Sequence, residues 1–223
     1  MNVVIIGANR GIGLALVQEY LKRGEQVWAV CRTISPEIQK LEQNMEHLTL
    51  IPNIEITEDH SRQELLKNLP PQVDHFIHNA GILERNTIQN LDSESIIRQF
   101  LVNALAPLQT ITTCLPHLQK VSKVGIVTSR MGSVQDNTSG SHYGYRMSKA
   151  AVNMAGVSLA HDVSDRGIGV YLLHPGYVKT DMTGGNGFID TQESAQGLVH
   201  QMYSFTMEQT GTFWHTNGDS LPW

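Results

Sequence analysis

The stretch NVVIIGANRGIGLALVQEYLKRG, residues Asn2–Gly24, decides the fold. It opens with an apolar run, continues through the glycine-rich turn Gly7–Gly13 and passes directly into a segment with helical periodicity. A short apolar run that ends in glycine is typical of a buried parallel strand, and Gly24 is typical of a helix end. The order of strand, glycine turn and helix predicts the first βαβ unit of a parallel sheet.

The glycine turn predicts a nucleotide site. Glycines allow a tight turn, a close approach of the backbone to a diphosphate, and close packing of the helix on the strand. Free N–H groups at the start of the following helix attract phosphate. A glycine-rich βα turn without a ligand is the alternative interpretation. The residues expected to form the phosphate loop are Gly7, Asn9, Arg10, Gly11, Ile12 and Gly13.

Outward from this unit, apolar runs alternate with helical segments, which predicts a parallel sheet covered by helices on both faces. We therefore predict an α/β fold, a Rossmann-type doubly wound parallel sheet in a single domain that spans residues 1–223. Pro107 and Pro116 are expected to kink or end the longest helical segment. The expected strands are 2–7, 26–32, 47–56, 73–81, 123–129 and 167–176, with 211–218 as a candidate edge strand, and the expected helices are 13–24, 61–69, 93–118, 142–164 and 191–204.

Composition is that of an ordinary globular protein. Of the 223 residues, 40% are hydrophobic and 17% charged, and the net charge is −5. An acidic balance without a basic stripe argues against nucleic acid as a partner. No apolar run approaches the ~20 residues of a membrane span, and no secretory signal or metal site is expected. Cys31 and Cys114 are expected to be buried free thiols in a reducing cytoplasm.

The end of the second strand bears on the choice of cofactor. A site that prefers NAD usually places Asp or Glu there to hold the ribose hydroxyls, but no acid lies between Val27 and Pro36. Arg32 stands there instead, and Arg10 supplies a second cation from the glycine loop. Guanidinium groups pair well with a 2′-phosphate, so the sequence predicts NADP(H) as the cofactor. The alternative for Arg32 is a solvated surface residue.

A second motif lies in YGYRMSK, residues 143–149. Tyr145 and Lys149 are four residues apart and therefore share one face of a helix, where they form either a surface pair or an acid/base device. Tyr143 has no lysine four residues later and is interpreted as packing or pocket wall. Ser129 follows a central strand, at the edge where open α/β sheets bind ligands. Thr128 would point to the opposite face of that strand.

These motifs together resemble the short-chain dehydrogenase/reductase family over essentially the whole chain. They occur in the family's order, and the stretches HPGYVKTDM and FWHTNGDSLPW look most like its C-factor-like, or sniffer-like, branch. The connection from Ser129 to Tyr145 is a little longer than usual in the family, so we expect this loop to bulge and shape the pocket. The matching motifs are Gly7-x-x-x-Gly11-x-Gly13, Asn79-Ala80-Gly81, Asn103, Ser129, Tyr145-x-x-x-Lys149, and Pro175-Gly176 followed by Thr180.

The resemblance implies roles for these residues. Tyr145 would exchange a proton with the substrate, Ser129 would bind the substrate oxygen, and Lys149 would hold the nicotinamide ribose. Lys149 and the charge of oxidised nicotinamide would lower the pKa of Tyr145, which is about 10 in free tyrosine. Asn103 would hold a water that links the lysine to solvent, which completes the catalytic set. Further cofactor contacts are expected from Glu55, Ile56, Asn79, Ala80, Gly81, Pro175, Gly176, Val178 and Thr180.

Three functions are considered at this stage. The first is an NADP(H)-dependent oxidoreductase acting on a small-to-medium, mainly apolar carbonyl or hydroxyl compound, beneath a flexible flap at 181–190. The second is an NAD(P)-binding signalling or sensor protein of C-factor type. The third, an epimerase or dehydratase of nucleotide sugars, would need a C-terminal substrate domain for which the chain leaves no room after Gly176. The small-residue helix KAAVNMAGVSLA makes a homodimer or homotetramer plausible.

Overall fold

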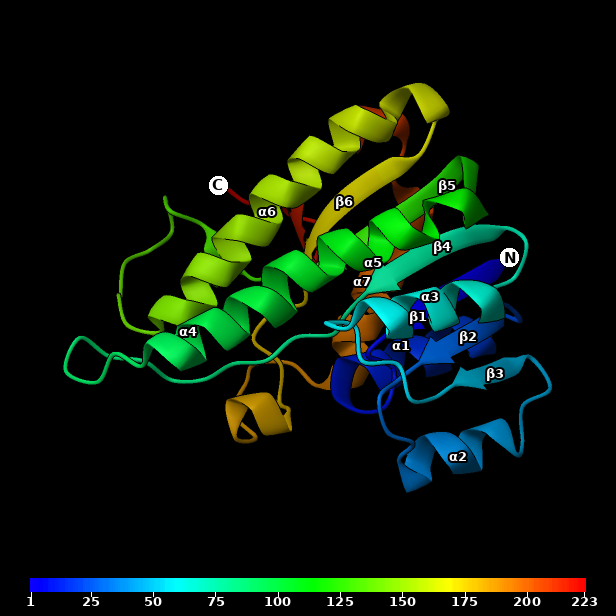
Figure 1. Ribbon diagram of the computed structural model, residues 1–223, viewed down its shortest axis with the longest axis horizontal. Helices are drawn as coiled ribbons and strands as arrows, with labels where there is room; N and C mark the ends of the chain where they lie inside the picture. Colours follow the sequence, from blue (N-terminus) through cyan, green and yellow to red (C-terminus); the bar gives the residue numbers. More distant parts are fainter.

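The computed structural model describes residues 1–223 and contains one sheet of seven parallel strands in the order β3-β2-β1-β4-β5-β6-β7 (Figure 1). The strand order reverses between β1 and β4, so their carboxyl ends border the crevice in which such sheets bind ligands. The strands are β1 Asn2–Ile6, β2 Gln26–Val30, β3 Leu48–Ile51, β4 Val73–His78, β5 Leu118–Val127, β6 Gly169–His174 and β7 Phe213–His215.

Helices cover both faces of the sheet. Side chains alternate along each strand, so Val4 and Ile6 pack on one face, whereas Val3 and Ile5 pack on the other. Helices α3, α4, α5 and α6 cover the first face, and α1, α2 and α7 cover the second (Figure 1). The helices are α1 Gly11–Lys22, α2 Pro36–Glu42, α3 Asp59–Asn68, α4 Ser93–Phe100, α5 Ala106–Cys114, α6 Tyr143–Val163 and α7 Thr191–Ser204.

The predicted doubly wound fold is confirmed, and α7 has the bounds predicted for it. The candidate edge strand is β7, which pairs with β6 at one end of the sheet. The sequence reading missed α2, which begins where the Ser35 hydroxyl accepts from the Ile38 N–H and Pro36 occupies the first turn. It also placed the start of β5 too late, because the polar residues before Lys123 hide the strand pattern.

The helix predicted over 93–118 is interrupted. A π-helical segment, Leu101–Leu105, joins α4 to α5, and a short 3-10 turn, Leu115–His117, follows α5. Pro107 closely follows the π segment, and because the residues before it are already helical, its missing N–H removes a bond from a continuous helix. The irregularity therefore lies next to the proline at which a kink or an end was predicted, and π segments are frequent at functional sites.

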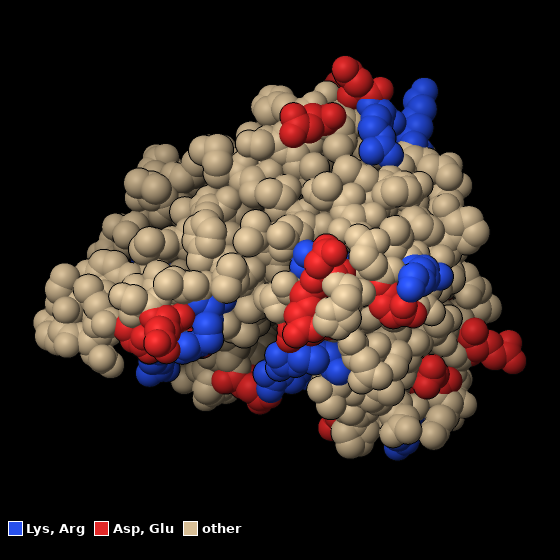
Figure 2. Space-filling model, in the orientation of Figure 1, with Lys and Arg blue, Asp and Glu red and all other residues tan.

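Charges are distributed in small mixed groups. Figure 2 shows lysine and arginine side chains beside aspartate and glutamate on this face, separated by wide uncharged areas. One exposed pair joins Arg98 to Glu84 at 2.8 Å. Cys31 and Cys114 are buried and unpaired, as predicted. None of the helices has the length and apolar character needed to cross a lipid bilayer.

Candidate active site

Four side chains from three parts of the chain meet at the carboxyl end of the sheet. Ser129 follows β5, Tyr145 and Lys149 lie on successive turns of α6, and Asn103 lies in the π segment. All four are buried, with exposed fractions of 7%, 8%, 4% and 1% in that order. Ser129 lies close enough to the Tyr145 phenol to lower its pKa, and the Lys149 ammonium lies 5.7 Å from the centre of the Tyr145 ring. The structure thus brings together the four residues that the sequence singled out.

Lys149 is a buried cation held by the backbone. Its ammonium donates to the Val127 carbonyl at 3.0 Å, and burial lowers its pKa to about 8. Gly81 leaves room beside it, since a Cβ at Gly81 would lie 3.5 Å from the ammonium and 3.2 Å from Asn103 Oδ1. Glycine at position 81 therefore lets the Lys149 ammonium and Asn103 lie close against the backbone of this loop.

Asn103 ties the π segment to the loop after β4. Its Oδ1 accepts from the Ile82 N–H at 2.8 Å, and its Nδ2 donates to the Ile82 carbonyl at 2.8 Å and to Ser148 Oγ at 3.0 Å. Both amide protons are used, and one lone pair of Oδ1 remains. That lone pair is compatible with the water that the family resemblance assigns to Asn103, which stays a prediction.

The pKa of Tyr145 differs from the direction that the lysine alone predicts. Burial raises this pKa to about 12, and the Ser129 hydrogen bond opposes the rise only in part. In the chain by itself, loss of solvation therefore outweighs the neighbouring ammonium. A phenol with a high pKa remains protonated at neutral pH, which is the form that can donate a proton.

The glycine loop forms a cradle that side chains would fill. Gly7 has φ +80°, and a Cβ there would lie 2.8 Å from the Ala80 Cα. A Cβ at Gly13 would lie 2.0 Å from the Gly7 carbonyl oxygen, which Asn79 Nδ2 also contacts at 3.0 Å. Asn79 and Ala80 thus belong to the support of this loop. Bare backbone at the start of α1, a helix of twelve residues, fits a dinucleotide diphosphate.

Ser35 is a support of this loop that the sequence reading missed. Its N–H donates to Asn9 Oδ1 at 2.6 Å, and its hydroxyl donates to the Asn9 carbonyl at 2.9 Å. These bonds join the glycine loop to the connection after β2. The signal for Ser35 was the Ser-Pro pair that starts α2, because serine before proline is a typical helix beginning.

The two arginines expected at the 2′-phosphate each contact a carboxylate. Arg32 Nη1 lies 3.2 Å from Glu55 Oε2, and Arg10 Nη1 lies 3.0 Å from Asp181 Oδ2. Burial raises the pKa of Glu55, but hydrogen bonds from Thr57 and Arg32 together bring it below its ordinary value. Both guanidinium groups are about three-quarters exposed, at 77% and 76%, so an incoming anion can reach them.

The remaining cofactor candidates lie on two loops at the same edge. Ile56 is buried, and its carbonyl accepts from Arg62 at 2.8 Å. After β6, the Pro175 carbonyl accepts from Ser194, and a Cβ at Gly176 would lie 2.8 Å from Ile189. Thr180 of the same loop lies beside the glycine loop, because its Cγ2 would be 3.7 Å from a Cβ at Gly11. Val178 forms an isolated parallel β-bridge with Ile189.

Comparison with known proteins decides the family. Residues 1–187 match the family model described as short chain dehydrogenase. The chain belongs to the short-chain dehydrogenase family. It is therefore an oxidoreductase of that family, with the seven-stranded fold described above.

Two curated relatives and two solved structures refine this result. The 1-hydroxy-2-glutathionyl-2-methyl-3-butene dehydrogenase of Rhodococcus sp. (strain AD45) is 38% identical over 99% of both chains. C-signal of Myxococcus xanthus is 39% identical over 68% of this chain and 93% of its own. The carbonyl reductase Sniffer of D. melanogaster is 28% identical with a TM-score of 0.93, and covers 100% of this chain and 99% of its own. A carbonyl reductase from chicken fatty liver with bound NADPH is 31% identical, with a TM-score of 0.91 and coverages of 100% and 98%.

These similarities confirm the predicted resemblance to the C-factor-like and sniffer-like members of the short-chain dehydrogenase family.

Within this dehydrogenase, backbone hydrogen bonds join the two ends of the segment that is predicted to be a flap. The Phe188 N–H donates to the Tyr177 carbonyl at 2.7 Å, and the Lys179 N–H donates to the Ile189 carbonyl at 3.0 Å. Beyond these bonds at the base of the segment, the Phe188 ring is 86% exposed and stands against the Tyr177 ring at 5.5 Å. The movement of this segment stays a prediction.

Proposed function

We propose that this dehydrogenase is an NADP(H)-dependent carbonyl reductase that also runs in the alcohol-oxidising direction. The observation that carries the proposal is the burial of the Tyr145 phenol and the Ser129 hydroxyl at one site, beside the Lys149 ammonium. A protonated phenol and a hydroxyl can both donate to one carbonyl oxygen. The nearby cation then stabilises the negative charge that develops there.

NADP(H) fits the cofactor side of the site. The glycine loop Gly7–Gly13 would receive the diphosphate at the start of α1, where no side chain intervenes. Arg32 and Arg10 would exchange their exposed carboxylate partners for the 2′-phosphate. Pro175, Gly176, Val178 and Thr180 would border the nicotinamide, whose bound form supplies or accepts the hydride. The NADPH in the related chicken enzyme supports this choice.

The chain's own residues provide the proton chemistry. Ser129 would orient the carbonyl oxygen, and Tyr145 would give it a proton as negative charge develops. Lys149, with a pKa of about 8, is still mainly protonated at pH 7 and would stabilise the phenolate that remains. Asn103 holds the π segment against Ile82 and would bind the water through which the proton is replaced.

We infer a small-to-medium, mainly apolar carbonyl or hydroxyl compound as substrate. The segment 181–190 would close over it as a flap, and this segment and its base carry exposed apolar side chains. Tyr177, Met182 and Phe188 are 47%, 44% and 86% exposed. A loop that is only solvated has little need for three such groups. Packing of the loop on its own domain is the alternative explanation.

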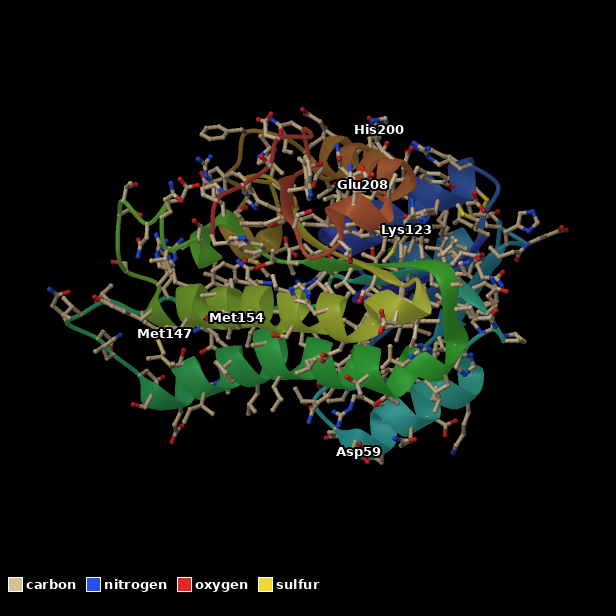
Figure 3. The ribbon with its side chains drawn as sticks, turned by 90° about the horizontal axis from the view of Figure 1, so that it is seen from above. Asp59, Lys123, Met147, Met154, His200 and Glu208 are labelled. Atoms are coloured by element: carbon tan, nitrogen blue, oxygen red, sulfur yellow. The ribbon has the colours of Figure 1, made fainter.

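The surroundings of the enzyme are a further part of the proposal. Two buried unpaired cysteines support a reducing cytoplasm. Exposed methionines on α6, Met147 at 53% and Met154 at 69%, support a homodimer or homotetramer (Figure 3). Light scattering on the purified protein measures this oligomeric state directly, and a monomer at micromolar concentration would contradict it.

A second candidate is a sensor that binds the cofactor without turnover, and the similarity to C-signal favours carrying it. The decisive experiment is a panel of aldehydes, ketones and quinones with NADPH, followed by nicotinamide absorbance. We expect turnover with at least one apolar carbonyl compound and none with Tyr145→Phe. Tight NADPH binding without turnover on any compound would favour the sensor, and equal rates for both proteins would contradict the mechanism.

A further inference from the structure

The connection that leads into α6 contains an unusual run of backbone conformations. Gly140, Ser141 and His142 are all left-handed, with φ of +62°, +54° and +52°. Glycine adopts this region freely, but it costs roughly 1–2 kcal/mol for each residue with a side chain. Such strain persists only where the surroundings hold it, and it is frequent near active sites. Here it lies directly before the helical turn that carries Tyr145.

One side chain holds this left-handed turn. Arg146 Nε donates to the carbonyls of Gly140 and Ser141, both at 3.1 Å. Its Nη2 donates to Ser139 Oγ at 2.8 Å, and its Nη1 reaches the Met131 carbonyl at 3.4 Å. Met131 belongs to the short turn after Ser129, so one guanidinium joins both ends of the connecting loop.

The opposite side of the turn is held by a buried polar network. The His142 N–H donates to the Asn86 carbonyl at 2.7 Å, and the Gly144 N–H donates to Asn86 Oδ1 at 3.3 Å. Gln99 Nε2, from α4, reaches the same Oδ1 at 3.2 Å, and both side chains are buried. A Cβ at Gly144 would lie 2.5 Å from this Gln99 nitrogen, so the start of α6 has no freedom toward α4. Only the side facing the loop depends on Arg146.

The loop in question connects the two groups that would bind the carbonyl oxygen. It begins after Ser129, continues through residues 133–142 beside the N-terminal end of α6 and leads into the first turn of that helix, which carries Tyr145 (Figure 1). It carries Val134, which is 80% exposed. Arg146 follows Tyr145 on the helix, but its guanidinium lies among the loop carbonyls. Arg146 therefore acts on the substrate side of the site only through the loop.

We propose that Arg146 is a positioning residue that fixes the 133–142 loop and thereby determines how the site receives its carbonyl substrate. The proposal rests on the carbonyl reductase function above. Without Arg146, the left-handed residues Gly140 and Ser141 lose the bonds to their carbonyls, and the loop relaxes away from Ser129 and Tyr145. The glycine loop lies on another part of the sheet edge, so cofactor binding does not change.

Steady-state kinetics on Arg146→Ala measure this directly. We expect KM for the carbonyl compound to rise about tenfold or more, with KM for NADPH within about twofold of the parent and a smaller change in kcat. Arg166→Ala is the matched control, because Arg166 also donates to two backbone carbonyls, those of Leu115 and Leu118, beyond the far end of α6. Its KM values should stay unchanged. Equal increases in both KM values of Arg146→Ala, or no increase, would overturn the proposal.

A glycine substitution separates positioning from general stability. Ser141→Gly accepts φ +54° without a steric cost, so in the Arg146→Ala background it should restore much of the lost carbonyl KM. In the parent it should change KM little. The same effect in both backgrounds would mean that Arg146 does not hold the turn. Where Arg146→Ala does not fold, Ser139→Ala removes one of the bonds alone and should raise the carbonyl KM severalfold.

Hydrogen exchange provides a measurement that needs no substrate. The amide of Gly140, which donates to Asn137 Oδ1 within the loop, should exchange at least about tenfold faster in Arg146→Ala, and at the parent rate in Arg166→Ala. Unchanged exchange would overturn the positioning role. If the parent protein reduces no carbonyl compound, the proposed function fails, but this exchange result still decides whether Arg146 holds the loop.

Discussion

The glycines of this protein have two different tasks in two regions of the molecule. In the phosphate loop, a Cβ at Gly13 would lie 2.0 Å from a backbone oxygen. In the flap, a Cβ at Gly184 would meet nothing nearer than 3.8 Å, and one at Gly185 nothing within 4 Å. The first region needs glycine because there is no space. Gly184 and Gly185 need it only because φ is positive, +64° and +79° at these two positions.

The comparison separates cofactor binding from substrate handling. The cofactor side is closed by contacts between backbone segments, such as Gly7 against Ala80, so it is formed before any ligand arrives. The proposed substrate side consists of two loops whose apolar residues Val134 and Phe188 are exposed. We expect substitutions on the first side to weaken cofactor binding, and substitutions on the second to change turnover or substrate affinity.

The largest expected effect is that of Tyr145→Phe, which should lower turnover strongly and leave NADPH binding nearly unchanged. Removing the phenol hydroxyl deletes the proton donor, which is worth about 10²–10⁴ in kcat for general acid catalysis. The glycine loop is untouched, so the NADPH dissociation constant should stay within about twofold, as measured by fluorescence titration. A Phe variant that retains most of the parent rate would contradict the assigned mechanism.

Gly13→Ala and Gly185→Ala test the difference between the two groups of glycines. The Cβ at Gly13 must displace the Gly7 carbonyl, and we expect NADPH binding to weaken about a hundredfold, or about 2.7 kcal/mol. Gly185→Ala meets open space and bears only the cost of a left-handed alanine, about 1 kcal/mol. Titration of NADPH and thermal unfolding measure both variants. Similar losses of NADPH affinity in the two variants would refute the distinction.

Arg32→Ala tests the cofactor side at its rim. Loss of a charge-assisted contact to the 2′-phosphate should weaken NADPH about tenfold to a hundredfold and leave NADH nearly unchanged. Arg98→Ala is the control, since Arg98 is likewise exposed and paired with a glutamate but lies on α4. Equal weakening of NADPH and NADH by Arg32→Ala would mean that Arg32 does not contact the phosphate.

The unfolding free energy of the protein should fall as the pH is lowered. Burial lowers the pKa of His75 to about 4 and of His78 to about 3, from an ordinary value of 6.5. The unfolded chain therefore binds more protons below pH 6.5, and each histidine removes about 1.4 kcal/mol of unfolding free energy per pH unit until its folded pKa is reached. Denaturant titrations between pH 7 and pH 5 measure this slope. His78→Gln should reduce this slope.

The smallest expected effect concerns the flap. Cleavage by a protease between Thr183 and Phe188 should slow severalfold with saturating NADPH and a substrate analogue, because closure would cover this segment. Cleavage near Asn44, an exposed site on the far side of β3, serves as the internal control and should not change. Identical cleavage rates at Thr183–Phe188 with and without ligands would end the proposal of a moving flap.

Much of this arrangement could be predicted from the sequence, because its signals are local. The spacing of Tyr145 and Lys149 places both on one helix face, and Ser129 follows a recognisable apolar strand. Parallel strands carry their C-terminal residues to one edge, so the site residues meet there without further information. The glycine motif is local in the same way.

The rest depends on contacts between distant residues, which leave no periodic pattern. Ser35 supports Asn9 from the next connection, and Arg146 binds the Met131 carbonyl from another element. The carboxylates that pair with Arg10 and Arg32 could not be foreseen from either arginine's neighbours. The rise in the pKa of Tyr145 also comes from burial, which depends on the whole packed structure.

The π segment Leu101–Leu105 makes the site sensitive to insertions and deletions. A π turn contains about one residue more than an α turn, and each α-helical residue rotates the chain by about 100°. Loss of one residue within 101–105 would give a regular helix, but it would turn Asn103 away from Ile82 or α4 away from α6. Point substitutions on the exposed face of the same helix leave the orientation of Asn103 and of α4 about the helix axis unchanged. The length of this helix should therefore tolerate change less well than most of its exposed residues.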